Sequence, residues 1–472
     1  MYNSKLYTIL EHFDKYEQNR CRKYIQSPYF NRSEELLELF EHLISAINGE
    51  NGLKLEKEYI WEKIQPGKDY DDVRFRKYCS DLLKLIEGYL AQQAYESNPL
   101  HQATYLMESI GKKKMKKLYS TAMRTSRRLL KQQSHKPSSY YFFQYEIEKN
   151  YYELTGFEIN RTDKTNVEDI IINLDYFYLA EKLRLYCSVL SRQYVVSHEY
   201  ELLFIDEIIN HIKQHDYQDV PAVSIYYQIY LTQTDVDDES HYYRLKSLLN
   251  KHSLNFPQKE AYTMYSYAMN YCIRKSNRGQ QNFLKELFEL YKDLLEKELI
   301  FTDGEMSPWD FRNIVVAALR LGKYQWTEGF IKKYQFRLKE NFRENAVTFN
   351  LAQLYFYQKK YDKVIELLRE VEYEDPTYNL NSKTMLLATY YEIDEIEPLY
   401  SLLESFRTYL NRHKDIPQQR RRNYKNLIKF TKKLTRIIPG DQDAIKKLKE
   451  EIESTKGIVS VNWLKEKLAE IE

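Results

Sequence analysis

The chain has 472 residues and a net charge of only +2, although 30% of its residues are charged. Its 12 glycines and 11 prolines are too few for the many tight turns of a sheet protein, which indicates helices joined by short polar connections. The four cysteines form no CxxC pair, so the sequence offers neither a disulfide framework nor a cysteine zinc site.

The first residues, MYNSKLYTILEHFDKYEQNR, are amphipathic and lack the uninterrupted apolar core of a secretory signal. No apolar run approaches the roughly 20 residues that are needed to span a bilayer. We therefore expect a soluble, cytoplasmic protein without a membrane partner.

Short helices are expected in an N-terminal helical region over residues 1–155. Pro28 and Asn31 end the first helical segment, and Ser33 is a candidate N-cap for the apolar periodic segment that follows. Further helices are predicted over about 55–64 and from about 71 to 90. The stretch YIQSPYFN resembles the start of uncharacterised solenoid-like proteins from Bacteroidota.

The segment over residues 60–90 also resembles the helix-turn-helix half of winged-helix domains. The residues that carry this likeness are Ile60, Trp61, Arg74, Ser80, Leu82 and Leu85. The resemblance implies that the second helix enters the major groove of DNA, with Arg74, Arg76 and Lys77 as its basic residues. A plain helical hairpin is the alternative interpretation.

Two stretches concentrate the positive charge of the chain. KKKMKKLYSTAMRTSRRLLK (112–131) contains nine basic residues and no acid, and residues 416–440 contain eight and no acid. On a helical wheel each stretch places its cations on one face, which predicts two amphipathic basic helices. The basic faces are Lys113, Lys117, Arg124, Arg127, Arg128 and Lys131 in the first stretch, and Arg421, Arg422, Lys425, Lys429, Lys432 and Arg436 in the second.

These faces have two interpretations. Cations on one side of a helix suit a polyanion such as nucleic acid, whose binding releases counterions. Basic faces are also often solvated, or paired with acidic helices of the same chain or of a partner. The sequence leaves both interpretations open.

From about Val167 onward, helical segments alternate with short connections, which is the period of an α-solenoid. The gap at 155–166 is a candidate hinge before this array. Residues 345–378 resemble a tetratricopeptide repeat, with large, small, aromatic and closing residues at the places of that motif; Val364 stands where alanine is usual. The matching residues are Leu351, Ala352, Tyr355, Tyr361, Leu368, Val371 and Pro376.

The likeness extends over about 308–411. In the following unit Leu386, Tyr390, Leu403 and Phe406 recur at the same places, whereas the preceding unit keeps LGKY and little else. Residues 441–472 fit a C-terminal cap of two short helices, whose apolar inward face consists of Trp463, Leu464 and Leu468.

The resemblance implies a concave groove lined by the first helix of each repeat. Its residues here are Phe349, Gln353, Phe356, Tyr357, Asn381, Thr384 and Tyr391. An aromatic groove with few cations suits an extended or helical peptide better than a free C-terminal carboxylate. The alternative is that some of these aromatic residues only pack within the fold.

Motifs of catalysis are not found. The sequence has no phosphate-binding loop and no nucleophile elbow, and His211 and His215, although spaced i,i+4, lack the glutamate of the zinc-protease motif. We expect no catalytic residue, no metal and no cofactor.

The sequence therefore predicts an all-α, non-catalytic protein. We expect a basic helix (112–131) inside the N-terminal helical region, a tetratricopeptide-like array of helical hairpins over 167–411, and a basic helix with capping helices over 412–472. The predicted function is that of a scaffold or adaptor that binds a peptide or protein in its concave surface. The alternative is a nucleic-acid-binding regulator that uses helices 112–136 and 420–436.

Overall fold

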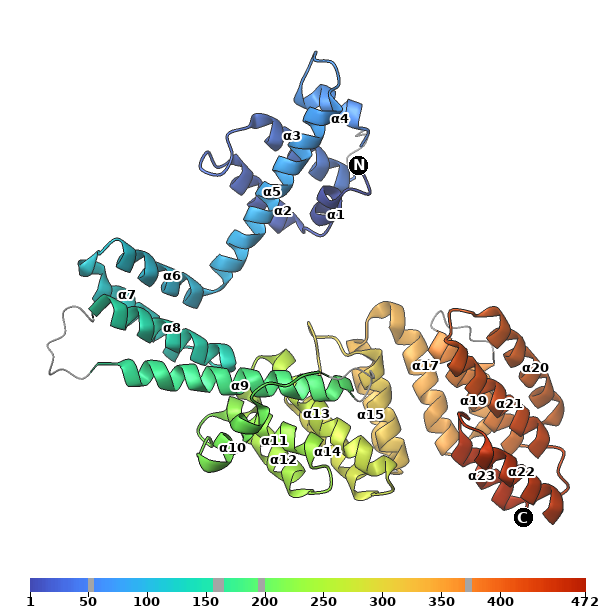
Figure 1. The fold of residues 1–472 in the computed structure, drawn as a ribbon. Helices are drawn as coiled ribbons and strands as arrows, with labels where there is room; N and C mark the ends of the chain where they lie inside the picture. The colour runs from blue at the N-terminus through green and yellow to red at the C-terminus, as the bar shows by residue number, and fades with distance from the viewer. Residues whose placement is uncertain (50–54, 156–164, 194–199, 370–375) are drawn as a thin grey trace. The chain divides into compact units, whose positions relative to one another are not determined.

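A computed structural model describes residues 1–49, 55–155, 165–193, 200–369 and 376–472. Within these ranges no β-strand occurs apart from an isolated bridge between Thr302 and Glu305, so the predicted all-α class is confirmed (Figure 1). The α-helices in chain order are α1 (Lys5–Glu11), α2 (Lys15–Gln26), α3 (Glu34–Ile47), α4 (Lys57–Ile64), α5 (Asp72–Ser97), α6 (Pro99–Lys112), α7 (Tyr119–Lys131), α8 (Ser138–Thr155), α9 (Val167–Gln193), α10 (Ile205–Gln214), α11 (Pro221–Thr234), α12 (Ser240–His252), α13 (Gln258–Asn277), α14 (Asn282–Glu296), α15 (Pro308–Arg320), α16 (Tyr324–Tyr334), α17 (Glu340–Tyr357), α18 (Tyr361–Leu368), α19 (Pro376–Glu392), α20 (Ile396–Arg412), α21 (Gln418–Leu434), α22 (Gln442–Ser454) and α23 (Val461–Glu470).

The chain divides into two compact units, Met1–Lys182 and Leu183–Glu472. The boundary lies inside α9. The three regions expected from the sequence stay a prediction. Most of the candidate hinge at 155–166 lies outside the described residues.

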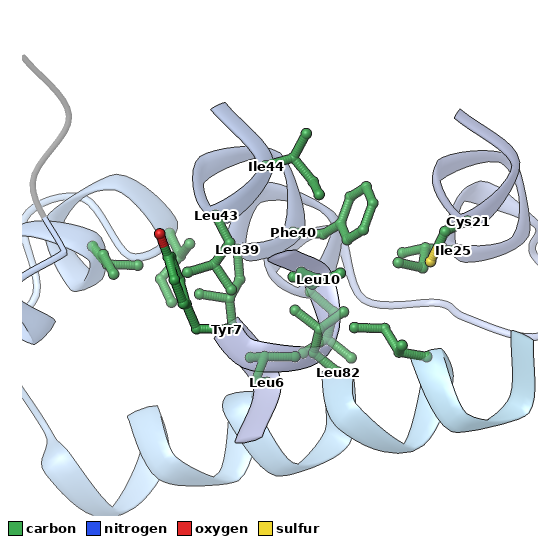
Figure 2. Close-up of a cluster of buried hydrophobic side chains, with 14 of the residues drawn as sticks. Leu6, Tyr7, Leu10, Cys21, Ile25, Leu39, Phe40, Leu43, Ile44 and Leu82 are labelled. Atoms are coloured by element: carbon green, nitrogen blue, oxygen red, sulfur yellow. The ribbon is translucent and has the colours of Figure 1, made fainter. Parts of the chain in front are cut away.

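The first unit begins with a core that α1 to α5 share. Leu6 and Leu10 of α1 meet the apolar face of α3 and Leu82 of α5, and all of these side chains are buried (Figure 2). Ser33 precedes α3 as predicted, but its hydroxyl donates to Glu35 Oε2 at 2.6 Å and caps no backbone N–H. The described residues contain no strands, so the winged-helix resemblance lacks its wing.

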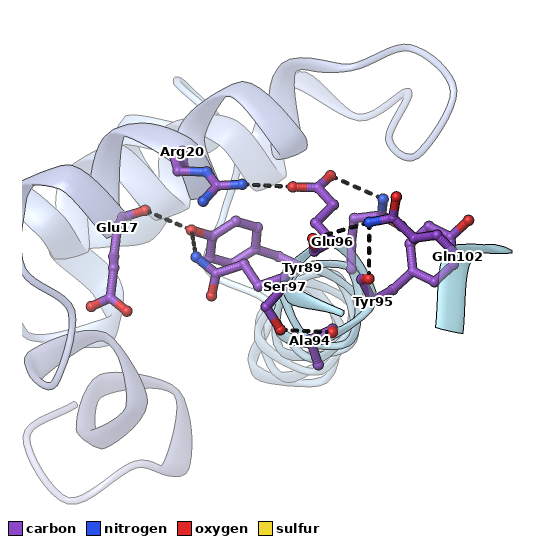
Figure 3. Close-up of polar contacts among 10 residues, drawn as sticks. Glu17, Arg20, Tyr89, Ala94, Tyr95, Glu96, Ser97 and Gln102 are labelled. Carbon is purple, nitrogen blue, oxygen red and sulfur yellow. Dashed lines mark hydrogen bonds and ion pairs between the residues drawn. The ribbon is translucent and has the colours of Figure 1, made fainter. Parts of the chain in front are cut away.

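The end of α5 is fixed by polar contacts with α2 and α6. Asn98 ends α5 and also caps α6, and Gln102 Nε2 donates to the carbonyls of Tyr95 at 3.1 Å and Glu96 at 3.0 Å (Figure 3). The Glu96 carboxylate pairs with Arg20 of α2 at 2.6 Å. Because the last carbonyls of α5 find donors, the chain turns into α6 without leaving them unpaired.

A second core of the first unit joins α6, α7 and α8, and it corrects the predicted basic helix. The expected single helix over 112–131 is wrong at its N-terminal end, because α6 ends at Lys112 and α7 begins only at Tyr119. Lys114 takes a left-handed φ of 54° and interrupts the helix between them. The chain then folds back, so that Met123 and Leu130 of α7 pack on α6 and α8.

In the second unit, successive helices pack as pairs. The pairs are α11 with α12, α13 with α14, α15 with α16, α17 with α18, and α19 with α20. First members of neighbouring pairs also meet, namely α11 with α13, α15 with α17, and α17 with α19. Apolar faces that one pair leaves uncovered are thereby buried against the next pair.

The turn inside four successive pairs is built in the same way. One residue takes a left-handed φ, which is 94° at Gly279, 70° at Gly322, 57° at Lys359 and 58° at Asp394. The next backbone N–H then donates to the carbonyl five residues earlier, at 3.2, 3.0, 2.9 and 2.9 Å respectively. This pattern ends a helix by satisfying one of its last carbonyls. The four reversals therefore share one local geometry.

Residues at the repeat-motif places form the core around α17 and α18. Ala352, Val364 and Leu368 are buried in one cluster with Phe349, whereas Val371 lies outside the described residues. Towards the C-terminus, α21, α22 and α23 pack together and bury Leu464 and Leu468 of the expected inward face.

Candidate functional site

The residues predicted to form a groove come together in the second unit. Six of the seven line one pocket of about 250 Å³. Four come from α17 and two from α19, and they are Phe349, Gln353, Phe356, Tyr357, Asn381 and Thr384. Tyr391 is not part of the lining, but its ring meets the ring of the lining residue Trp463 edge-on, with centroids 5.3 Å apart.

Helical spacing explains why these residues lie on one side of α17, but their side chains differ in solvent exposure. Residues three or four positions apart share one side of a helix, as Phe349, Gln353 and Phe356 do on α17. Phe349 is only 1% exposed and is a packing residue at the floor of the pocket, as the alternative interpretation allowed. Tyr357 is 40% exposed, so it lies at the rim, and partial burial nevertheless raises the pKa of its hydroxyl.

The C-terminal helices supply a wall that the sequence reasoning missed. Val459, Ser460 and Trp463 line the pocket, together with Leu427 of α21. The sequence assigned Trp463 only to the cap, because its helix lies outside the repeat motif.

Trp463 is held in place by a buried ion pair. Its indole Nε1 donates to Glu392 Oε1 at 3.3 Å, and the same carboxylate accepts from Lys467 Nζ at 2.8 Å. Lys467 also reaches Glu470 at 2.8 Å. Burial alone lowers the pKa of Lys467, but the bonds to the two glutamates outweigh it and leave the pKa raised.

Among the described residues that line the pocket, Arg312 of α15 is the one charged side chain. It is half-buried, and among the described residues it forms no ion pair. Its Nε is buried without a hydrogen-bond partner, as is the Oε1 of Gln353. The guanidinium carbon lies 5.8 Å from the ring centroid of Phe349, and burial lowers the pKa of Arg312. The pocket therefore combines aromatic walls with an unpaired cation and an unused acceptor.

A second pocket, of about 800 Å³, lies on the other side of α15, against α13. Asp310 lines it and accepts a hydrogen bond from the Tyr262 hydroxyl at 2.7 Å. Burial raises the pKa of Asp310. Because Asp310 and Arg312 are two positions apart on one helix, their side chains leave it about 200° apart. The two pockets thus receive opposite charges from the same helix.

The basic face of the first stretch is exposed and sparsely paired. Arg127 forms an ion pair with Glu148 at 3.1 Å, and its guanidinium lies 5.4 Å from the ring centroid of Tyr151. Lys113 and Lys117 lie in the connection before α7 and not on its face. Within the described ranges, five exposed side chains of this stretch form no ion pair: Lys113, Lys117, Arg124, Arg128 and Lys131.

The second basic face is largely engaged within the chain. Lys432 of α21 pairs with Glu404 of α20 at 3.1 Å, and Lys429 pairs with Glu451 of α22 at 3.9 Å. Lys425 donates to Asn411 at 2.7 Å. Of the remaining residues of this face, Arg421 and Arg422 lie in the first turns of α21, and Arg436 follows its end. These contacts fit the interpretation that this face binds neighbouring acidic helices.

Groups with metal-ligand chemistry are few in the described part of the chain. His211 and His215 stack on each other with centroids 4.2 Å apart, and neither forms an ion pair with a carboxylate of the described residues. Asp235, Asp238 and His241 place their ligand atoms within 4.8 Å of one another. That loop lies beside the cations Lys275 and Arg278, which pair with its other acids and oppose a bound cation.

Comparisons with known proteins give no assignment. No family model matches the chain, and neither a curated protein nor a solved structure matches it. In the part of the chain that the structure describes, no helix combines the length and the apolar composition that crossing a bilayer requires. The function is therefore argued from the pocket between α17, α19 and α23, which we call the α17–α19 pocket.

Proposed function

We propose that this chain is a non-catalytic scaffold or adaptor that binds a segment of a protein or peptide at the α17–α19 pocket. The observation that carries the proposal is the convergence of six residues, predicted only from their places in a repeat motif, on one cavity. We also propose that the second unit is a tetratricopeptide-like array of helical hairpins. The four turns of identical hydrogen-bond pattern support this arrangement.

The size of the pocket suits one anchor. Sites for whole small ligands usually enclose about 300–1,000 Å³, so a volume of about 250 Å³ suits one large side chain with its neighbours. The aromatic walls give such an anchor apolar contacts and edge-to-face ring contacts, worth about 0.5–1.5 kcal/mol per aromatic pair beyond area burial. Packed helices already hold these walls in place, so binding orders little of the receptor.

A library of random peptides displayed on phage, selected against the full chain, tests this proposal. We expect selected peptides to bind the wild type and to lose binding to Tyr357→Ala, which changes a half-exposed rim residue. Tyr243→Ala, in an exposed residue of α12 away from the pocket, is the matched control and is expected to bind normally. Selection of no peptide, or of peptides that bind Tyr357→Ala as well as wild type, contradicts the proposal.

Nucleic-acid binding is the second candidate function, and the unpaired cations of α7 favour it. Retention on heparin, followed by binding of mixed-sequence DNA and RNA over a salt series, provides the test. Arg124→Glu/Arg128→Glu should abolish binding, and Lys429→Glu/Lys432→Glu should change it little, since the latter pair is engaged within the chain. Absence of binding at low salt rejects this function.

A further inference from the structure

The guanidinium of Arg312, which has no ion pair within the described part of the chain, is unusual for a protein interior. Charged groups that leave water are normally paired, because their desolvation is compensated only by an opposite charge or by several hydrogen bonds. Arg312 has a buried Nε without an acceptor, and the described residues bring it no carboxylate. Among the residues that the structure describes, Arg312 is thus a cation without a partner.

The surroundings of Arg312 favour an anion from outside. Within the described ranges no acidic residue lines the pocket, and the nearby Arg420 adds to the positive potential there. The carboxylate of Glu392, at the end of α19, is already engaged with Lys467 and with the lining residue Trp463. The Phe349 ring contacts the guanidinium through cation–π attraction, while a carboxylate binds best in the guanidinium plane. Charge complementarity therefore points to a carboxylate as the missing partner.

We propose that the α17–α19 pocket selects a partner segment that carries an aspartate or glutamate next to a large apolar residue. The carboxylate pairs with Arg312, the apolar side chain packs against Phe356 and Trp463, and a donor of the segment bonds to Gln353 Oε1. This inference rests on the proposed function, because it names the chemistry of the segment that the pocket takes.

An internal acidic side chain fits better than a chain terminus. A free C-terminal carboxylate is usually held by more than one cation or by a set of backbone N–H groups, and this pocket contributes a single guanidinium. The half-exposed Tyr357 leaves the rim open, so a continuing chain can pass over the pocket. We therefore assign the carboxylate to a side chain.

The test uses peptides selected as described above, each made in an acidic form and in a form with Asn or Gln in place of the acid. Fluorescence anisotropy measures both forms on the wild type, Arg312→Gln and Arg312→Lys. On the wild type, neutralising the acid should weaken binding about ten- to hundredfold, the range of a hydrogen bond to a charged group. On Arg312→Gln, the two forms should bind alike, and Arg312→Lys should restore only part of the difference, because lysine lacks the planar pair of donors. Arg278→Gln, in an exposed arginine that pairs with Asp237, is the control and should behave as wild type.

The outcomes separate this inference from the proposed function. Peptides that need Tyr357 but are indifferent to neutralisation leave the proposed function standing and overturn the acidic preference. An equal effect of neutralisation on wild type and Arg312→Gln places the carboxylate elsewhere and also overturns it. Loss of binding on amidation of the peptide terminus, with no effect of the internal acid, assigns the carboxylate to a chain end and refutes our assignment. Failure to select any peptide removes both proposals.

Discussion

The ion pair of Lys467 with Glu392 offers a sharp prediction about the second unit. The Lys467 side chain is 7% exposed, and the Glu392 side chain is 18% exposed. Lys467→Met keeps most of the aliphatic stem and removes the charge, which leaves the Trp463 N–H as the remaining donor to Glu392 among the described residues. The pair joins α23 to α19, so its loss should loosen the packing of the C-terminal helices.

The expected loss of unfolding free energy follows from the burial of each partner in the ion pair. Removing one member of a buried pair costs about 3–5 kcal/mol, and Glu392 keeps some solvent and one hydrogen bond, so we expect about 2–3 kcal/mol. The second partner, Glu470, is 55% exposed and adds at most about 1 kcal/mol. The raised pKa of Lys467 means that this stabilisation is complete below the ordinary lysine pKa and is lost only as pH rises through the folded-state value. Neutral pH is therefore a suitable condition.

A double-mutant cycle followed by urea denaturation and circular dichroism measures the pair. Glu392→Gln in the Lys467→Met background should recover much of the loss, with a coupling on the order of 2 kcal/mol, because the uncompensated charge is gone. The control is Lys465→Met on the same helix, whose ion pair with Glu453 at 3.8 Å is exposed, and it should cost less than about 1 kcal/mol. A coupling below about 0.5 kcal/mol, or a control as damaging as Lys467→Met, would refute the reasoning.

Three further predictions concern stability. Burial raises the pKa of Asp310, so its contribution to folding stability is present below the ordinary aspartate pKa and is lost as pH rises through the raised value. Asp310→Asn, which still accepts from Tyr262, should therefore raise the midpoint of thermal unfolding at neutral pH. A stability gain of this variant that does not shrink in acid would contradict the reasoning. Gly457 has a φ of 74° and a side chain there would collide with Asn423, so Gly457→Ala should lower stability by about 1–2 kcal/mol in urea titrations, and an unchanged midpoint would argue against the collision. Phe349→Ala, at a residue that is 1% exposed, should cost about 3–5 kcal/mol in the same titrations and reduce binding through unfolding; normal stability with lost binding would show that Phe349 is a contact residue instead.

Much of the helical organisation was predictable because it depends on local signals. The break at Pro28 and Asn31 and the apolar periodicity after Ser33 placed the start of α3 correctly. The hydrogen-bond partner of the Ser33 hydroxyl was not predictable in this way, because the Glu35 carboxylate in the same turn accepts from it. The prediction of one continuous basic helix was wrong at Lys114. A helical wheel assumes helical φ and ψ angles at every residue, so it gives no sign of a single left-handed residue.

The pocket was predictable only in part, for a related reason. Motif spacing locates residues on helices of the same repeat, and Gln353 and Thr384 followed it. Arg312 comes from α15, in the preceding repeat of the second unit, where the motif is weak. Trp463 comes from α23, a helix that lies outside the repeat motif but packs against it. Such contacts depend on packing between segments far apart in the sequence, so no local pattern predicts them.

The position of Trp463 has a consequence for how binding will depend on conditions. The α17–α19 pocket is complete only while the last helix is seated on α19, and terminal helices are where local opening is easiest. The observed dissociation constant is then the intrinsic one divided by the seated fraction. Warming or mild denaturant will weaken binding well before the unit melts, and a ligand will in turn protect the amides of the final helix from exchange.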